Sequence, residues 1–160
     1  VVEALLALER SLPGRLQLLV VCGEDEAARL RLTHRALSST MPMRVFGFVD
    51  YMADLMAASD LVVSKAGGLT VSEALGRGLP LVLYHVIPGQ ERMNAQYVVQ
   101  RGAAMIAPRA VEVAAAVRRF LEDPGRAEAM RRAARALSSP RVAERIVSDV
   151  FTPLLTRRSP

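Results

Sequence analysis

Short apolar runs alternate with longer amphipathic stretches along this sequence, and that alternation limits the fold more than any other feature. Residues 16–22 and 61–63 are almost continuously aliphatic, which is typical of strands buried on both faces of a parallel sheet. Strands that alternate with helices indicate an α/β fold, a doubly wound Rossmann-like parallel sheet flanked by helices. The predicted strands cover residues 16–22, 44–48, 61–63, 80–84 and 103–106, and the predicted helices cover residues 1–11, 25–38, 52–58, 69–76 and 91–101.

The 160 residues are enough for one domain with a core of its own. Residues 110–160 are predicted to form a C-terminal tail. The tail is expected to be helical as far as about residue 155, with breaks at Pro124-Gly125 and at Pro140. No run of eighteen apolar residues occurs, so a membrane-spanning helix is not expected. The sequence begins without a basic region ahead of an apolar stretch, so we expect no signal peptide. The lone Cys22 favours a reducing, cytoplasmic setting.

The net charge of +5 comes almost entirely from arginine, since Lys65 is the only lysine among 21 basic residues. A basic balance favours anionic partners such as phosphates or an anionic membrane. The alternative is that the arginines cover solvated helix faces, because half of the 20 arginines lie in the predicted helical tail after residue 110. Aromatic residues make up only 4% of the chain, which argues against a stacking surface for nucleic acid, so no nucleic-acid partner is expected.

The loop at residues 64–74 carries the clearest signal for a ligand. Doubly wound sheets bind ligands beyond the carboxyl ends of their strands, where helices begin. Gly67 and Gly68 would let backbone approach a ligand closely, and the free amides of the following helix start suit a diphosphate. Thr70 adds a hydroxyl donor, and Glu73, one turn further on, can accept two ribose hydroxyls. The alternative is an ordinary strand–helix turn with Thr70 and Glu73 as capping residues.

A second polar loop covers residues 88–95. Gln90, Glu91 and Asn94 can all bond sugar hydroxyls, and the last two would share a helix face. The alternative is a polar helix start capped by Gln90 or Glu91. His85 ends a predicted strand and is a candidate general base, although a structural histidine is the commoner outcome.

Several other classes of site lack their sequence signature. The dinucleotide pattern G-x-G-x-x-G and the phosphate-binding P-loop are absent. No metal-ligand spacing of cysteine and histidine and no D-x-D pair occurs, so a metal-dependent transfer is not expected.

Taken together, the two loops resemble a known family. The sequence is similar, over about residues 16–107, to the C-terminal, donor-binding domain of the GT-B glycosyltransferases that act on diacylglycerol. These include monogalactosyldiacylglycerol synthase and the processive diacylglycerol glucosyltransferases, and the peptidoglycan N-acetylglucosaminyltransferase is related to them. The positions that carry the resemblance are Gly47-Phe48-Val49, Met52, Leu55-Met56, Ser59-Asp60, Lys65-Ala66-Gly67-Gly68, Thr70, Ser72-Glu73-Ala74, Gly78, Pro80, Pro88-Gly89-Gln90-Glu91, Asn94 and Gly102.

The resemblance implies a role for each loop. Backbone near Phe48 and Val49 would read the uracil, with Met52 close to it. Gly67, Gly68 and Thr70 would hold the diphosphate and Glu73 the ribose. Gln90, Glu91 and Asn94 would face the donor sugar and the phosphates. We also predict that Lys65 lies near the nucleotide or supports its loop. A chain that otherwise uses arginine can need a compact ammonium here, and chance retention is the alternative.

The resemblance further implies an inverting, metal-independent hexosyltransferase that uses a UDP-sugar and no cofactor. The acceptor would be a lipid such as diacylglycerol, and the enzyme would sit peripherally on the inner face of the cell membrane. We expect residues 1–160 to form one nucleotide-sugar-binding domain with no catalytic residue of its own. The N-terminal acceptor domain, with the catalytic base, and the family's first strand would lie outside this chain, so the isolated chain would be inactive.

The acceptor and the sugar stay open at this point. The Pro88-Gly89-Gln90-Glu91 form is closer to the diacylglycerol enzymes than to the peptidoglycan enzyme. Glu24, however, stands where the diacylglycerol enzymes often have arginine. A peptidoglycan-type or natural-product glycosyltransferase, or a non-catalytic nucleotide-sugar-binding module, are the alternatives.

Overall fold

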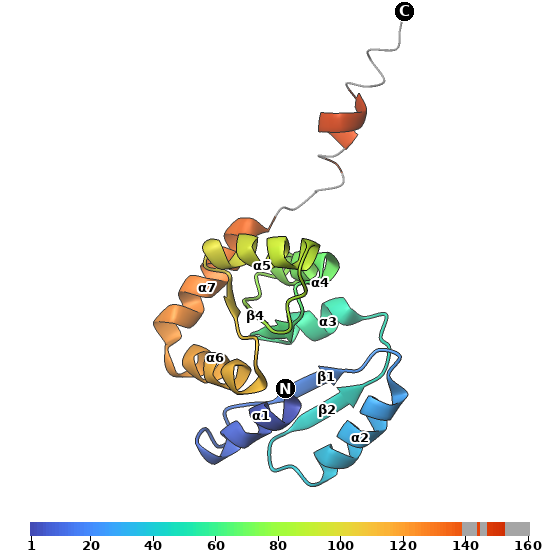
Figure 1. Cartoon of the computed structure of the whole chain (residues 1–160), viewed down its shortest axis with the longest axis vertical. Helices are drawn as coiled ribbons and strands as arrows, with labels where there is room; N and C mark the ends of the chain where they lie inside the picture. The colour runs from blue at the N-terminus through green and yellow to red at the C-terminus, as the bar shows by residue number, and fades with distance from the viewer. Residues whose placement is uncertain (139–143, 145–146, 153–160) are drawn as a thin grey trace, which may run out of the picture.

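The computed structural model describes residues 1–138, 144 and 147–152. Helices cover both faces of a set of parallel strands (Figure 1), so the predicted α/β fold class is confirmed. The strands are β1 (Leu18–Val21), β2 (Met43–Phe46), β3 (Val62–Ser64), β4 (Leu81–Leu83) and β5 (Ala104–Ile106); the main helices are α1 (Val2–Leu6), α2 (Glu26–Leu37), α3 (Met52–Ala57), α4 (Gly68–Gly76), α5 (Gln90–Gln100), α6 (Ala110–Glu122) and α7 (Pro124–Leu137).

The strands form two parallel groups. β1 pairs with β2, with Leu18 opposite Met43, and a second group has the order β3-β4-β5, with Leu81 lying between Val62 and Ala104. Within the described part of the chain, β1 and β3 do not pair with each other. The sheet is therefore divided between these two strands.

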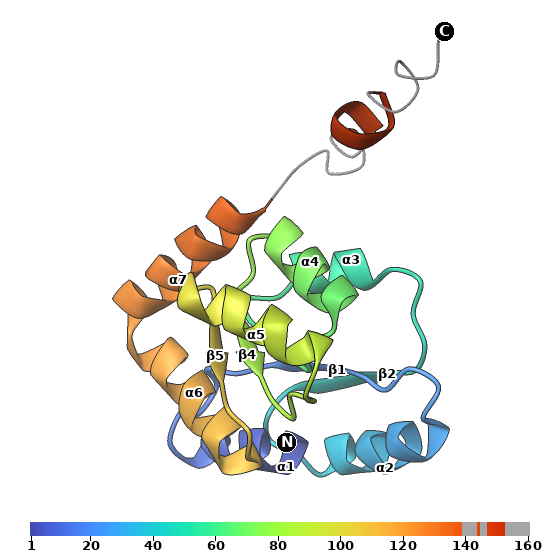
Figure 2. The ribbon, with the colours of Figure 1, turned by 45° about the horizontal axis from the view of Figure 1, so that its top comes forward.

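The core lies in two layers on opposite faces of β4. Leu81 and Leu83 pack among residues of α3, α4, α5 and α7, whereas Val82 packs among residues of α1 and α6. Figure 2 shows part of this division, with α3 and α4 above β1 and β2 and with α1 and α2 below them. This arrangement follows from the two-residue period of a strand, which sends successive side chains to opposite faces.

The strands differ from one another in burial. All three residues of β4 have zero exposure, whereas every residue of β1 and of β3 is half-buried. The prediction that residues 16–22 and 61–63 are buried on both faces was therefore wrong. The reason is that β1 and β3 each have a neighbouring strand on one side only.

The first predicted helix is shorter than expected. α1 ends at Leu6 and continues as a 3₁₀ turn, η1 (Ala7–Arg10), which is a common way for a helix to end. Leu5, Leu8 and Leu12 are all buried, as predicted from their spacing.

The helical tail breaks at Asp123 instead of within Pro124-Gly125. Pro124 is the first residue of α7, where its missing N–H costs nothing, and the Asp123 carboxylate accepts a hydrogen bond from the Arg126 amide at 2.9 Å. The predicted break at Pro140 lies outside the described residues. Further on, Val147–Phe151 forms a single helical turn, η2.

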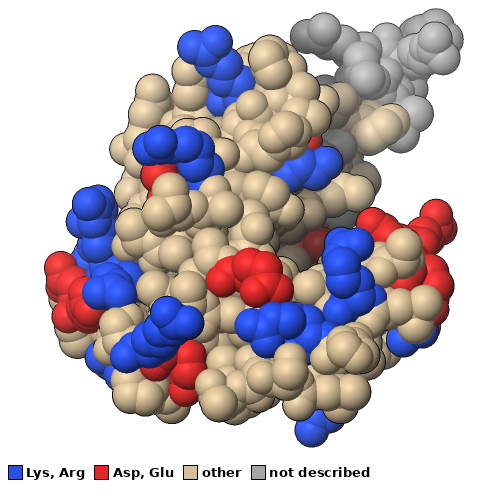
Figure 3. Space-filling model, turned by 60° about the horizontal axis from the view of Figure 1, so that its bottom comes forward, with Lys and Arg blue, Asp and Glu red and all other residues tan. Residues whose placement is uncertain are grey.

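The charged surface mixes both signs. Figure 3 shows basic and acidic side chains interspersed over one face. Arg29 pairs with Glu26, Arg35 with Glu3, and Arg131 with Asp60. These pairs favour the interpretation that many arginines cover solvated helix faces. Among the described residues, no helix is long and apolar enough to cross a membrane.

Candidate functional site

A cavity of about 430 Å³ lies between β1 and β3 and reaches the carboxyl ends of both strands. Its volume is within the range of small-molecule sites, about 300–1,000 Å³. Three residues predicted to hold the nucleotide line it, namely Met52 at the start of α3 and Thr70 and Glu73 in α4. The other lining residues are mostly aliphatic or small: Leu19, Val21, Cys22, Gly23, Leu55, Met56, Ser59, Leu61, Val62, Val63 and Ser64.

The start of α4 is an open helix N-terminus. Gly67 is its N-cap, no side chain caps it, and its first turn holds no acidic residue. The interpretation that Thr70 and Glu73 cap this helix was therefore wrong. Neither side chain has a hydrogen-bond partner within residues 1–138. The free amides and the helix dipole give this end a partial positive charge that suits an anion.

The two glycines of this loop leave space above those amides. Gly67 has an ordinary backbone conformation, with φ −62°, and an added Cβ would meet no atom within 4 Å. A Cβ on Gly68 would lie 3.7 Å from Nδ2 of Asn94, which is ordinary contact. No positive φ requires glycine at these two positions. The absence of a side chain leaves the first amides of α4 uncovered.

The start of α5 lies beside the start of α4. The Asn94 side-chain amide donates a hydrogen bond to the Ala66 carbonyl at 3.0 Å and so ties α5 to the loop that precedes α4. The Glu91 carboxylate accepts from the Ile87 amide at 3.2 Å within its own loop. Gln90 has no side-chain partner among the described residues, and no side chain caps α5. The capping alternative for Gln90 and Glu91 was therefore also wrong.

The remaining predicted residues lie on the same edge but outside the cavity lining. Phe48 and Val49 are in the loop between β2 and α3, and the Phe48 side chain is 77% exposed. Lys65 is exposed between β3 and α4, and it joins none of the ion pairs in the described part of the chain. His85 is the one non-glycine residue there with a positive φ, 48°, and it is exposed at the end of β4.

Comparison with known proteins places this arrangement in a family. Residues 1–146 match the glycosyltransferase family 28 C-terminal domain. The chain belongs to this family.

The matched relatives and structures agree with that assignment. This family 28 domain is 34% identical over 136 residues to a processive diacylglycerol beta-glucosyltransferase of Bacillus cereus (strain AH187). That match covers 85% of the chain and 35% of the relative, so the chain spans about a third of its length. The crystal structure of Acinetobacter baumannii MurG has a TM-score of 0.69 at 22% identity, with 91% of this chain and 46% of MurG covered.

A third match is a solved structure from Phytolacca americana. The structure of Phytolacca americana UGT2, complexed with UDP-2fluoro-glucose and pterostilbene, has a TM-score of 0.67 at 16% identity. The match covers 97% of this chain and 37% of UGT2. At these identities the two structures establish the fold of the family 28 domain and nothing finer.

Sequence reasoning passed over Cys22 as a member of the site. Its thiol lines the cavity, and burial together with the nearby Asp25 carboxylate raises the pKa of that thiol. The signal was present in the sequence, since Cys22 directly follows an aliphatic run whose carboxyl end points to the same edge as residue 64. Among the described residues of this family 28 domain, no group of three or more His, Cys, Asp or Glu side chains is placed to hold a metal ion.

Proposed function

We propose that this family 28 domain binds the UDP-sugar donor of a hexosyltransferase whose acceptor is a lipid such as diacylglycerol. The observation that carries the proposal is the uncapped start of α4, which opens beside a cavity lined by Thr70 and Glu73. The relative at 34% identity is a processive diacylglycerol beta-glucosyltransferase, which supports both the reaction and the acceptor class.

In this proposal the nucleotide lies across the divided sheet. The diphosphate sits over Gly67 and Gly68, where the helix amides and the Thr70 hydroxyl donate to its oxygens. The Glu73 carboxylate accepts from the ribose hydroxyls. The uracil lies toward Met52 and toward the loop of Phe48 and Val49, which follows β2 at the same edge of the sheet. Lys65, which precedes Gly67, adds an exposed positive charge close to the diphosphate.

The donor sugar lies at the start of α5. The Gln90 side chain is free there. The Asn94 side-chain nitrogen donates to the Ala66 carbonyl, so the Asn94 side-chain oxygen is left to accept from a sugar hydroxyl. One Glu91 carboxylate oxygen accepts from the Ile87 amide, and the other is available to the sugar. Hydrogen-bonding groups of this kind distinguish sugar epimers, because a wrong epimer leaves a buried polar group without a partner.

The transfer step places a specific demand on α4. The acceptor hydroxyl oxygen attacks the anomeric carbon, the bond from that carbon to the β-phosphate oxygen breaks, and UDP departs with an additional negative charge. The α4 amides stabilise that charge, and their orientation is already fixed before the reaction. The proton of the acceptor hydroxyl passes to a base in the acceptor domain, and no cofactor takes part.

Exposed apolar side chains gather on this edge of the sheet and favour an interaction surface for another part of the enzyme. Phe48, Leu69 and Met93 are 77%, 83% and 71% exposed. Phe48 lies in the loop after β2, and Leu69 and Met93 lie in the first turns of α4 and α5. Exposed apolar groups that gather at one edge are typical of an interaction surface. We assign the acceptor domain and its lipid to this side, with peripheral association of the whole enzyme with the membrane.

The nucleotide site is tested by Glu73→Ala in the full-length enzyme. Loss of two hydrogen bonds to a charged group should weaken UDP binding by about 1.5–3 kcal/mol, or roughly 10- to 150-fold, measured by calorimetry. Ser72→Ala is the matched control, because Ser72 is the exposed neighbour of Glu73 on α4 and does not line the cavity. Normal UDP binding by Glu73→Ala would remove Glu73 from the site.

The sugar site is tested by Gln90→Ala. We expect a lower kcat/KM for the donor and a changed ratio between UDP-glucose and UDP-galactose. Inhibition by free UDP should stay within about threefold, or ~0.7 kcal/mol. If UDP inhibition and transfer fall in proportion, Gln90 contacts the nucleotide and this division between the two loops is wrong.

A further inference from the structure

One side-chain hydrogen bond joins the two loops of the site. The Asn94 side-chain nitrogen, in the second turn of α5, lies 3.0 Å from the carbonyl oxygen of Ala66, 28 positions earlier. Among the described residues it is the only hydrogen bond between residues 64–70 and residues 86–101. Asn94 is half-buried and Ala66 is fully buried. The contact is therefore partly sheltered from water, where a hydrogen bond is stronger than at the surface.

The orientation of the Asn94 side chain follows from the chemistry of its partner. The Ala66 carbonyl can only accept, so the NH2 group of Asn94 must face it and the side-chain oxygen cannot. That oxygen points away from Ala66 and has no partner in the described part of the chain. Asn94 thus has one end engaged and the other end available to accept.

The Ala66 carbonyl belongs to the same peptide unit as the Gly67 amide. A trans peptide is planar, so its carbonyl and its N–H point in opposite directions and cannot turn independently. A hydrogen bond on the Ala66 oxygen therefore fixes the direction of the Gly67 N–H. That amide stands at the uncapped start of α4 and has no hydrogen-bond partner within residues 1–138.

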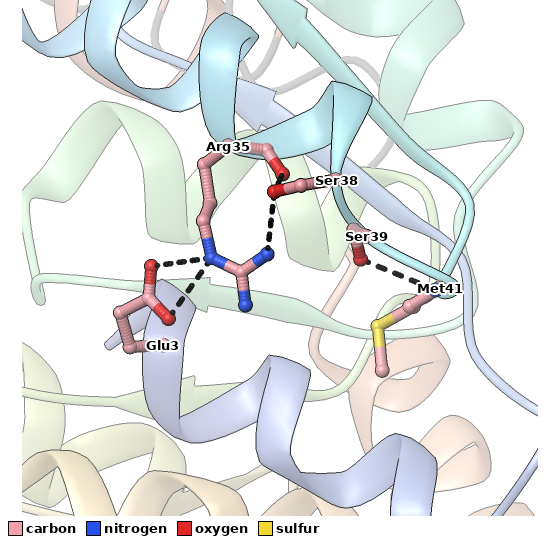
Figure 4. A network of polar contacts seen from close by, with 5 residues as sticks. All are labelled: Glu3, Arg35, Ser38, Ser39 and Met41. Atoms are coloured by element: carbon pink, nitrogen blue, oxygen red, sulfur yellow. Dashed lines mark hydrogen bonds and ion pairs between the residues drawn. The ribbon is translucent and has the colours of Figure 1, made fainter.

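Another polar contact between neighbouring helices lies away from the site. Figure 4 shows Arg35 of α2, whose Nε lies 3.2 and 3.3 Å from the two carboxylate oxygens of Glu3 on α1. This contact is exposed, and α1 and α2 lie on the face of β1 and β2 opposite α3 and α4 (Figure 2). Removal of the Arg35 side chain therefore shows the effect of losing a contact between helices alone.

A ligand hydroxyl on the Asn94 oxygen would strengthen the hydrogen bond at its nitrogen. The two ends of a carboxamide are conjugated, so a hydrogen bond accepted by the oxygen polarises the N–H groups and makes them better donors. The side chain is also confined to one rotamer when both ends are bonded. A sugar at the start of α5 can therefore act on the Gly67 amide through Asn94 and Ala66 without touching α4.

We propose that Asn94 is a positioning residue that couples the donor-sugar subsite to the diphosphate subsite. Its nitrogen orients the Ala66-Gly67 peptide unit, and its oxygen, bound to a sugar hydroxyl, holds that orientation more firmly. The inference rests on the proposed function for the identity of the two ligands. It adds that the subsites are not independent, so the diphosphate is held more firmly in the intact donor than in UDP. Release of UDP after transfer is thereby made easier.

The first test compares the binding of UDP and of UDP-glucose to the full-length enzyme by calorimetry. Asn94→Ala should weaken UDP binding by about five- to tenfold, because the bond that orients the loop is lost. UDP-glucose binding should weaken at least about threefold more than that, because the sugar contact is lost as well. Arg35→Ala is the control and should leave both affinities within about twofold. Asn94→Leu keeps most of the side-chain volume, removes both polar ends, and repeats the test if Asn94→Ala does not fold.

Three results of this test would overturn the proposal. Unchanged UDP binding by Asn94→Ala would make Asn94 a sugar ligand only. Weakening of UDP and UDP-glucose by the same factor would show that the sugar does not act through Asn94. A loss in Arg35→Ala as large as that in Asn94→Ala would assign the effect to helix packing. If the wild-type enzyme does not bind UDP, the proposed function itself is wrong, so the two failures are distinguishable.

The second test observes the hydrogen bond by NMR. Ala66-Gly67 is the only Ala-Gly pair in the 160 residues, so labelling of alanine carbonyl carbons and glycine nitrogens selects this peptide unit, with Gly67→Ala to assign its signal in the full-length enzyme. Without ligand, the Ala66 carbonyl carbon should move upfield in Asn94→Ala, as expected for a carbonyl that loses a hydrogen bond, and should stay in place in Arg35→Ala.

The same carbonyl signal measures the coupling. The difference between its position with UDP-glucose and with UDP should be larger, in the downfield direction, in the wild type than in Asn94→Ala. The comparison between the two proteins removes the effect of the different phosphate charge of the two ligands, because that effect is common to both. An equal difference in the wild type and in Asn94→Ala would overturn the coupling, and an unmoved signal in ligand-free Asn94→Ala would overturn the positioning role.

Discussion

The strands β4 and β1 have nearly the same composition and very different surroundings. β4 consists of two leucines and a valine and is entirely buried, whereas β1 consists of two leucines and two valines and is half-buried throughout. β4 has a strand on each side and helices on both faces, and β1 has a strand on one side only. Burial of an aliphatic strand therefore depends on the number of its neighbours and not on its own residues.

The comparison predicts unequal costs for the same substitution, and this is the largest effect we expect. In the 160-residue chain, Leu81→Ala should lower the free energy of unfolding by about 2–5 kcal/mol, because it leaves a cavity in a closed core. Leu19→Ala on β1 should cost about 1 kcal/mol, because much of that side chain is already exposed. Urea unfolding of both variants gives the two values.

An equal loss of unfolding free energy in the two variants would contradict this difference, since it would mean that β1 is as closed in solution as β4.

Two glycines, one before each of these strands, should differ less in the stability that an alanine substitution costs. Gly14 precedes β1 and Gly78 precedes β4, and both have φ +68°. A Cβ at Gly14 would meet no atom within 4 Å, whereas one at Gly78 would lie 2.6 Å from Cγ of Arg135. Gly14→Ala should cost about 1 kcal/mol from the left-handed backbone alone, and Gly78→Ala should cost about 2 kcal/mol because Arg135 must also move.

Thermal and urea unfolding of the two glycine variants measure that difference. A double variant with Arg135→Ala is the control, since it removes the contact and should bring Gly78→Ala close to Gly14→Ala. If Gly14→Ala costs as much as Gly78→Ala, packing around the turn is not what separates the two regions.

The smallest expected effect is electrostatic and should be alike in both regions. A hydrogen bond from the Arg109 side chain lowers the pKa of Glu112 on α6, and one from the Arg29 side chain lowers the pKa of Glu26 on α2, in each case below the ordinary 4.5. A carboxyl with a lowered pKa in the folded state stabilises the fold above its unfolded pKa. That contribution is lost as the pH falls from about 4.5 through the lower folded value.

Glu112→Gln and Glu26→Gln should therefore each make the free energy of unfolding slightly less dependent on pH below about 4.5. Both effects should be small and reduced by salt, because both pairs are exposed. Unfolding titrations between pH 2 and 7 measure them. A large change in only one variant would show that the two regions differ in electrostatics as well as in packing.

The fold class and the order of the elements follow from the amino-acid sequence alone. Aliphatic runs that alternate with amphipathic stretches predicted every strand to within a few residues, because side-chain periodicity is a local property. The loops at residues 64–74 and 88–95 could be identified because they follow predicted strands, and a parallel sheet brings the carboxyl ends of its strands to one edge. The roles given to Phe48, Gln90 and the other predicted site residues remain predictions.

The division of the strands, and the polar groups that already have partners, are visible only in the folded molecule. The aliphatic run at residues 16–22 has the pattern of a buried central strand. Its pattern does not predict that β1 pairs with a strand on one side only. In the same way, Asn94 reads like a free sugar ligand, but its amide holds the Ala66 carbonyl 28 positions earlier in the chain. Both facts depend on contacts between residues far apart in sequence, which a local pattern does not contain.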